Sequence, residues 1–187
     1  NKKPYKIAKL GISRTFQTIK LFPQMSVLET VMLGRHIRSR ASFIECLTAA
    51  PWIWFEEKKI KEKAIELLEI FKLKDVMYNE AMSLPFGKQR LVELARALAT
   101  EPELLLLDEP ASGLNINETD EFAEIIVSLK NKGMTIIIVE HDMSLVMRIS
   151  DEVVVLNFGE KIAEGKPFDI QKNQEVINIY LGDEDNA

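Results

Sequence analysis

The stretch that decides the fold is Leu104-Leu105-Leu106-Leu107-Asp108-Glu109-Pro110. Four successive leucines without polar alternation are typical of a strand in a parallel sheet that helices cover on both faces. Ligands bind at the carboxyl ends of such strands, and two adjacent carboxylates stand at the end of this one. We therefore predict that Asp108 holds a hydrated Mg²⁺ and that Glu109 orients or deprotonates an attacking water. The alternative is an ordinary helix N-cap followed by a first-turn acid.

Helices and strands are predicted to alternate along the chain after residue 87. Apolar spacing predicts a helix over 88–100, and a capping pattern at Asn115 predicts another helix that runs to about residue 131. The apolar runs 135–139 and 153–156 predict two more strands, and residues 157–160 predict a hairpin-like turn. This order of elements favours a right-handed α/β sheet.

The N-terminal region is predicted to begin with a strand and a capped helix. The apolar pattern of residues 11–16 indicates a short strand that stops at Gln17. Ser26 and Glu29 have the spacing of a capping box, which predicts a short helix over 27–34. Gln17 is therefore predicted to stand at the end of a strand.

A less regular segment separates this helix from the next one. It contains a basic cluster at Arg35, Arg38 and Arg40 and an aromatic patch over Trp52–Phe55. Aromatic residues beside an amphipathic helix usually pack inside, and an exposed docking surface for a partner helix is the alternative. Apolar spacing then predicts an amphipathic helix over 56–71.

The composition indicates a globular chain with one sizeable core. The 187 residues are 47% hydrophobic, and no apolar run reaches the roughly 18 residues that a membrane span requires. Residues 1–4 lack the apolar segment of a signal peptide, so we expect a soluble protein in the cytoplasm. Cys46 is the single cysteine, which excludes an intramolecular disulfide. The net charge of -5 argues against a general nucleic-acid surface.

Five motifs occur in the order that ATP-binding-cassette (ABC) ATPases use. They are Gln17, Leu84–Arg90, Leu104–Pro110, Ser112–Asn115 and His141. In that order they resemble the family's Q-loop, signature loop, Walker B strand with catalytic glutamate, D-loop and switch histidine. The resemblance covers nearly the whole chain and is closest to the ATPase subunits of importers for branched-chain or other hydrophobic amino acids. Three stretches carry this finer likeness: 14–29, 108–119 and 179–182.

The resemblance implies an α/β fold, a partial P-loop NTPase (RecA-like) parallel-sheet core with an inserted helical subdomain. The ranges expected are a core strand and Q-loop in 1–19, the helical subdomain in 20–86, the signature helix, Walker B strand, H-loop and C-terminal helix in 87–182, and a tail in 183–187. The implied cofactors are ATP and Mg²⁺. The implied partners are a second ABC ATPase subunit, transmembrane permease subunits and a periplasmic or extracellular substrate-binding protein, with no nucleic acid. Through the permease, the cytoplasmic subunit would lie on the inner face of the cell membrane.

The loop before the helix predicted at 88–100 is a candidate anion site. The first amides of a helix and the positive end of its dipole attract a phosphate, which favours contacts from Gly87 and Lys88. The resemblance assigns nucleotide contact to Pro85, Phe86, Gly87, Lys88 and Gln89, facing ATP that the other subunit holds. Pro85 and Phe86 replace a serine and a glycine that many members of the family have, so contact is expected mainly at the Gly87 end. An ordinary helix-start turn is the alternative.

The remaining assignments also follow from the resemblance. Ser112 and Gly113 of the D-loop are expected near the nucleotide, and Gln17 is expected to bind Mg²⁺ or its water and to report the γ-phosphate to a membrane partner. His141 follows a β-branched strand, and the intervening helix and strand return the chain to the sheet edge beside Glu109. Its imidazole is therefore expected to contact the γ-phosphate and the attacking water. A structural histidine and an ordinary strand-end glutamine are the alternatives.

One motif of the family is absent from this sequence. No Gly-x-x-x-x-Gly-Lys-Ser/Thr occurs, so the Walker A strand and the N-terminal β-subdomain that relatives carry are expected to be missing. We expect the chain to begin inside the cassette, to be unstable alone and to bind MgATP weakly. A central strand would then be lacking, so the apolar faces of 104–107 and 136–138 are expected to be exposed.

Two other functions remain open at this stage. A soluble cassette ATPase that acts on DNA or ribosomes shares the same motifs, although such proteins usually add a coiled coil or a second cassette, and the sequence shows neither heptads nor a repeat. A non-catalytic cassette fragment would explain the missing phosphate loop, whereas the presence of both Glu109 and His141 opposes it.

Overall fold

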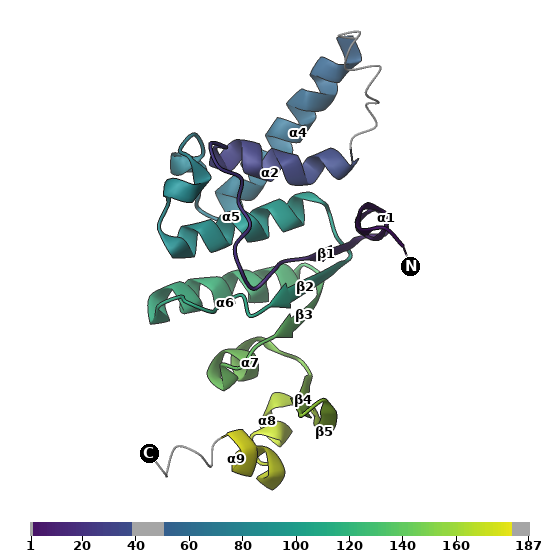
Figure 1. Ribbon diagram of the computed structural model, residues 1–187, viewed down its shortest axis with the longest axis vertical. Helices are drawn as coiled ribbons and strands as arrows, with labels where there is room; N and C mark the ends of the chain where they lie inside the picture. The colour runs from purple at the N-terminus through teal and green to yellow at the C-terminus, as the bar shows by residue number, and fades with distance from the viewer. Residues whose placement is uncertain (1, 39–50, 181–187) are drawn as a thin grey trace. The chain divides into compact units, whose positions relative to one another are not determined.

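The computed structural model describes residues 2–38 and 51–180 (Figure 1). The chain divides into two compact units, residues 1–139 and 140–187. This division falls within the range 87–182 that the sequence analysis treats as one core. The expected tail 183–187 lies outside the described residues.

The first unit contains a three-stranded sheet and most of the helices. Its elements are α1 (Pro4–Lys9), β1 (Ile12–Arg14), α2 (Val27–Arg35), η1 (His36–Arg38), α4 (Pro51–Ile70), η2 (Lys74–Val76), η3 (Ala81–Ser83), α5 (Phe86–Ala99), β2 (Leu104–Asp108), α6 (Ile116–Asn131) and β3 (Thr135–Val139). The strands lie in the order β1-β2-β3, and both pairs are parallel (Figure 1). Ser13 is opposite Leu105, and Leu106 is opposite Ile137. The predicted parallel sheet is confirmed, and its carboxyl ends meet at one edge.

The exposure predicted for the apolar strands is found in β3 and only in part in β2, where Leu104 and Leu106 are half-buried. Leu105 and Leu107 are buried, and β2 is the central strand of the three. The expectation of an exposed face was wrong for these residues. In β3, an outer strand of this sheet, Ile137 is 53% exposed and Val139 is 59% exposed.

The helical part of the first unit is held together by α2 and α5. The capping box of α2 is present as predicted, with the Ser26 hydroxyl and the Glu29 carboxylate each bonded to the other's backbone N–H. The hydrogen bonds that the backbone N–H and the hydroxyl of Ser26 donate to this carboxylate hold the pKa of Glu29 below its ordinary value. Helix α2 packs against α5 so closely that a Cβ added to Gly34 would overlap the carbonyl oxygen of Arg96.

Two helix boundaries and one helix differ from the sequence-based expectations. Helix α4 begins at Pro51 rather than residue 56, α5 begins at Phe86 rather than residue 88, and α1 was not predicted. In α4, Trp54 is 81% exposed and Phe55 is 71% exposed, so the expectation that they pack inside was wrong. Both precede the buried residues Ile60, Ala64 and Leu68 of the same helix. Nothing is described for the side chains of residues 52 and 53, and Arg40 of the basic cluster lies outside the described residues.

The second unit has its own small core. It comprises α7 (Met143–Ile149), β4 (Val153–Asn157), β5 (Glu160–Gly165), α8 (Pro167–Ile170) and α9 (Gln174–Tyr180). Strand β4 pairs antiparallel with β5 through a tight turn at Phe158 and Gly159, which both have positive φ. The predicted hairpin is confirmed, whereas β4 forms no part of the parallel sheet that the order of elements had suggested. The core gathers Val146, Val155, Ile170 and Val176.

In residues 2–38 and 51–180, no helix combines the length and the apolar character needed to cross a bilayer.

The close approach of α2 and α5 gives a first prediction. We expect Gly34→Ala to lower the free energy of unfolding by about 1–3 kcal/mol, because the new methyl group must push apart two helix backbones. Chemical denaturation followed by circular dichroism measures this change. Gly165→Ala is the matched control, since an added Cβ there meets no atom closer than 3.9 Å. Equal effects of the two substitutions would contradict the packing described here.

Candidate functional site

Asp108 lies at the carboxyl end of β2 and is paired with an arginine of the neighbouring strand. The Arg14 guanidinium donates a hydrogen bond of 2.9 Å to its Oδ2 atom. The Asp108 side chain is 34% exposed, so solvent reaches it. The sequence predicts this carboxylate as a metal ligand but does not predict its arginine partner.

Glu109 follows directly after β2, leaves the extended backbone conformation of the strand and contacts Gln17. Its φ of 43° is in the left-handed region, which is rare for a residue with a side chain and costs about 1–2 kcal/mol. Its N–H donates to the carbonyl of Val139 at 2.8 Å, which fixes the backbone at the strand end. The side-chain amide of Gln17 then donates to Glu109 Oε2 at 2.8 Å. Two predicted site residues 92 positions apart are thus in direct contact.

The turn after Glu109 connects the D-loop to the start of α5. The Ser112 N–H donates to the Glu109 carbonyl at 3.2 Å. Gly113 has a φ of +81°, and a Cβ added there would lie 2.9 Å from the Phe86 ring. The predicted D-loop and the predicted signature loop therefore touch within one chain.

The residues of the signature loop have different surroundings. Helix α5 begins after Pro85 without a side-chain cap, and Lys88 is exposed, as an anion-binding helix start requires. Gly87 is buried, and its missing Cβ makes room for the Glu118 carboxylate. The side-chain amide of Gln89 donates to the carbonyls of Met82 at 3.1 Å and Leu84 at 2.8 Å. Gln89 thus holds the preceding loop in place.

Three charged side chains of α5, which are not among the site residues predicted from the sequence, surround the backbone that follows β1. Arg90 donates to the carbonyls of Phe16 at 3.1 Å and Gln17 at 2.5 Å. Glu93 accepts from the N–H of Lys20 at 3.3 Å. Arg96 donates to the carbonyl of Lys20 at 2.6 Å. We call Arg90, Glu93 and Arg96 the α5 clamp.

The α5 clamp is internally paired, with Arg90 and Glu93 buried and Arg96 partly exposed. Arg90 is 5% exposed and Glu93 is 2% exposed, with 3.4 Å between the Arg90 guanidinium and Glu93 Oε2. Arg96 lies 3.6 Å from Glu93 Oε1. Burial raises the pKa of the Glu93 carboxyl, and the Lys20 N–H, Arg96 and Arg90 oppose that rise. Burial likewise lowers the pKa of Arg96, which the charge of Glu93 opposes.

A signal for the clamp is present in the sequence. The spacing Arg90-x-x-Glu93-x-x-Arg96 places three charged residues on one helix face. The residues between them are apolar, mostly leucine and alanine. Charges at this spacing usually indicate a solvated face, and only the tertiary structure reveals that this face is buried.

His141 follows β3 by two residues and belongs to the second unit. Its imidazole is 72% exposed, with Nδ1 at 4.0 Å from the carboxylate of Glu140. The exposure leaves the ring accessible, and its approach to Glu109 stays a prediction.

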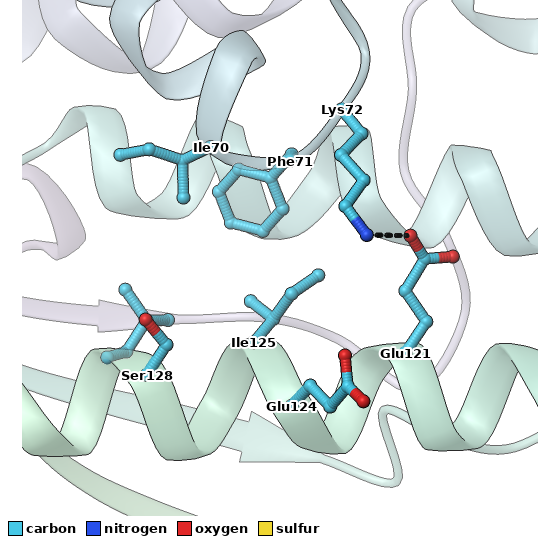
Figure 2. A pocket seen from close by; sticks show the side chains of 8 residues that line it. Ile70, Phe71, Lys72, Glu121, Glu124, Ile125 and Ser128 are labelled. Atoms are coloured by element: carbon cyan, nitrogen blue, oxygen red, sulfur yellow. Dashed lines mark ion pairs between the residues drawn. The ribbon is translucent and has the colours of Figure 1, made fainter.

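A groove elsewhere in the first unit contains none of the predicted site residues. It lies between the end of α4 and α6, with Ile70, Phe71 and Ile125 facing one another (Figure 2). At one end, Lys72 forms an ion pair of 3.7 Å with Glu121. The groove is therefore separate from the carboxyl edge of the sheet where Asp108 and Glu109 lie.

Comparison with known proteins decides the family. The sequence profile of the ABC transporter family matches residues 1–112, which include β1, α5 and β2. The chain belongs to the ABC transporter family. A second profile, described as branched-chain amino acid ATP-binding cassette transporter, matches residues 160–186 of this ABC cassette.

Individual relatives of the cassette agree with the family match. It is 39% identical over 180 residues to the high-affinity branched-chain amino acid transport ATP-binding protein BraF of Pseudomonas aeruginosa, covering 96% of this chain and 71% of that protein. It is 40% identical to the corresponding protein LivG of Escherichia coli K12, covering 95% and 70% of the two chains. Among solved structures, the ADP conformation of MJ1267, an ATP-binding cassette of an ABC transporter, matches with a TM-score of 0.79 at 34% identity, covering 97% of this chain and 72% of that one.

The contact between Gly113 and Phe86 gives a second prediction. We expect Gly113→Ala to destabilise the cassette by about 2–5 kcal/mol, because it combines a strained backbone with a steric clash against the ring. In a Phe86→Ala background the clash is removed, so the cost should fall to that of the backbone alone, about 1–2 kcal/mol. Denaturant unfolding of the four proteins measures the difference. Identical costs in both backgrounds would exclude the contact.

Proposed function

We propose that this cassette is the ATP-hydrolysing subunit of an importer for branched-chain or other hydrophobic amino acids. The observation that carries the proposal is the hydrogen bond from Gln17 to Glu109, next to the pair of Arg14 with Asp108. It joins a proton-accepting carboxylate and a polar side chain at the edge of a parallel sheet where ligands bind. The substrate class rests on the relatives, which are named for branched-chain amino acid transport.

The donor groups at this edge suit Mg²⁺. This ion keeps several waters and takes one or two carboxylates together with the phosphates of its substrate. In the part of the chain that the structure describes, no group of three or more His, Cys, Asp or Glu side chains gathers as a dedicated metal cage. The Asp108 carboxylate and the side-chain amide oxygen of Gln17 would hold the ion, which neutralises phosphate charge when bound.

Each residue of the site has a proposed task in hydrolysis. Glu109 accepts a proton as a water oxygen attacks the γ-phosphorus and ADP departs. Gln17 orients that carboxylate through their hydrogen bond. His141 donates to the γ-phosphate. The exposed start of α5 at Lys88, with Ser112 and Gly113 beside it, contacts ATP held by a second cassette.

The proposed assembly follows from these tasks. Because the signature loop faces nucleotide in another subunit, two cassettes act as a pair. Transmembrane permease subunits, with a periplasmic or extracellular substrate-binding protein, would supply the pathway and the selectivity. The cassette then lies on the cytoplasmic face of the membrane, held there by the permease.

Substitution of the proposed base gives a third prediction. The test uses the chain extended at its N-terminus by a segment that carries a Walker A motif, and we call this protein the extended cassette. We expect Glu109→Gln to lower its ATP turnover by about 10²- to 10⁴-fold, because the amide cannot accept a proton. ATP-dependent dimerisation, measured by light scattering, should persist because the shape and polarity are kept.

Two controls accompany this measurement. Glu160→Gln changes an exposed carboxylate in the second unit and should leave turnover unchanged. The 187-residue chain should bind MgATP about 100-fold more weakly than the extended cassette, because it lacks the charge-assisted phosphate contacts of a Walker A loop. Turnover of Glu109→Gln near the parent rate would exclude Glu109 as the base.

Transport gives a fourth prediction. In vesicles that contain the extended cassette, its permease and the binding protein, we expect ATP-dependent uptake of labelled leucine. Labelled lysine is the matched control, since a pathway for apolar side chains rejects a charged one by its desolvation cost. The Glu109→Gln variant should abolish leucine uptake. Uptake of lysine at the same rate, or turnover without association with membrane proteins, would contradict the importer proposal.

A further inference from the structure

We propose that Arg90 and Glu93 are positioning residues, which tie the backbone of residues 16–20 to α5 so that Gln17 and the signature loop move as one body. This inference rests on the proposed function for its meaning in catalysis. Its structural content rests on the α5 clamp, whose side chains bond to backbone atoms of Phe16, Gln17 and Lys20.

The backbone after β1 depends on these side chains for its hydrogen bonds. Residues 15–25 form neither helix nor strand. The Thr15 N–H still pairs with the carbonyl of Leu106 at 3.0 Å, which is the last bond of the segment to the sheet. Beyond this point, the carbonyls of Phe16, Gln17 and Lys20 are bonded by guanidinium groups of α5. The clamp therefore takes the place that a sheet partner would have.

Arg90 and Glu93 are both buried, so each depends on its charged and backbone partners for compensation of its charge. A buried ion pair adds little net stability by itself, whereas removal of one partner costs several kcal/mol because it leaves an uncompensated charge. Arg90 Nε is buried without a hydrogen-bond partner, although the two terminal nitrogens are bonded. The two terminal nitrogens of the guanidinium thus reach two successive carbonyls, while Nε is left without an acceptor.

The same side chain also contacts the signature loop. The Arg90 guanidinium lies over the Phe86 ring, with 5.5 Å to its centroid. A continuous set of contacts therefore runs from Phe86 through Arg90 to the Gln17 carbonyl, and from the Gln17 side chain to Glu109. Displacement of either end displaces the other, which would link the nucleotide at Glu109 to the nucleotide that the signature loop contacts in the paired cassette.

Hydrogen exchange of the 187-residue chain tests the structural part. Arg90→Lys keeps the charge but removes the planar guanidinium that bonds the two carbonyls, and Glu93→Gln keeps the shape but removes the charge. We expect the backbone amides of Thr15 and Lys20, which donate to Leu106 and Glu93, to exchange at least about tenfold faster in both variants, with unchanged exchange at Leu105. Val92→Ala, a fully buried residue of the same helix without polar side-chain atoms, is the matched control. Unchanged exchange at Thr15 and Lys20, or an equal effect in Val92→Ala, would overturn the proposal.

A double-mutant cycle in the extended cassette tests the catalytic part. If Arg90 acts through Gln17, Arg90→Lys should lower kcat at least about tenfold in the parent and less than twofold in a Gln17→Ala background. Additive losses would show that Arg90 acts by another route, which overturns the proposal. Absence of turnover in the unsubstituted extended cassette would instead count against the proposed function, and hydrogen exchange would then decide the inference alone.

Discussion

The parallel pairing of β1 with β2 is the constraint on which the rest of the first unit depends. It sets Arg14 opposite Leu106, two residues before Asp108. The chain that leaves β1 therefore passes the two carboxylates, and Arg14 and Gln17 meet Asp108 and Glu109 in that order. Strand β3 pairs on the other side of β2 and holds the backbone of Glu109 through Val139. A shift of one residue in this register would turn Asp108 to the opposite face and separate the contacts.

Much of this arrangement could be predicted from the sequence because local signals were strong. Four leucines followed by two acids identified β2 and its functional edge, and the capping boxes at Ser26 and Asn115 identified the starts of α2 and α6. The capping boxes are local signals, because each one joins a side chain to a backbone N–H three residues away. The family resemblance rested on motifs of the same kind, and the match over residues 1–112 confirms it.

The features that sequence reasoning missed depend on contacts distant along the chain. Arg90 and Glu93 look like a solvated helix face until the segment after β1 is placed over them, 73 or 74 residues earlier in the sequence. Strand β4 has the apolar pattern of a sheet strand, yet it pairs with its neighbour β5 because a tight turn brings that partner close. Trp54 has the large apolar side chain typical of a core residue, but it lies in the first turn of α4 and is 81% exposed.

The left-handed backbone of Glu109 has a consequence for how this position responds to variation. Glycine, asparagine and aspartate accept such a conformation at lower energy than glutamate, while β-branched residues resist it strongly. A screen for folded variants at residue 109 would therefore enrich the first group, whereas a screen for turnover would retain glutamate. The two selections favour different residues at the same position. The thermal stability of variants at residue 109 is therefore a poor guide to which residue the reaction requires there.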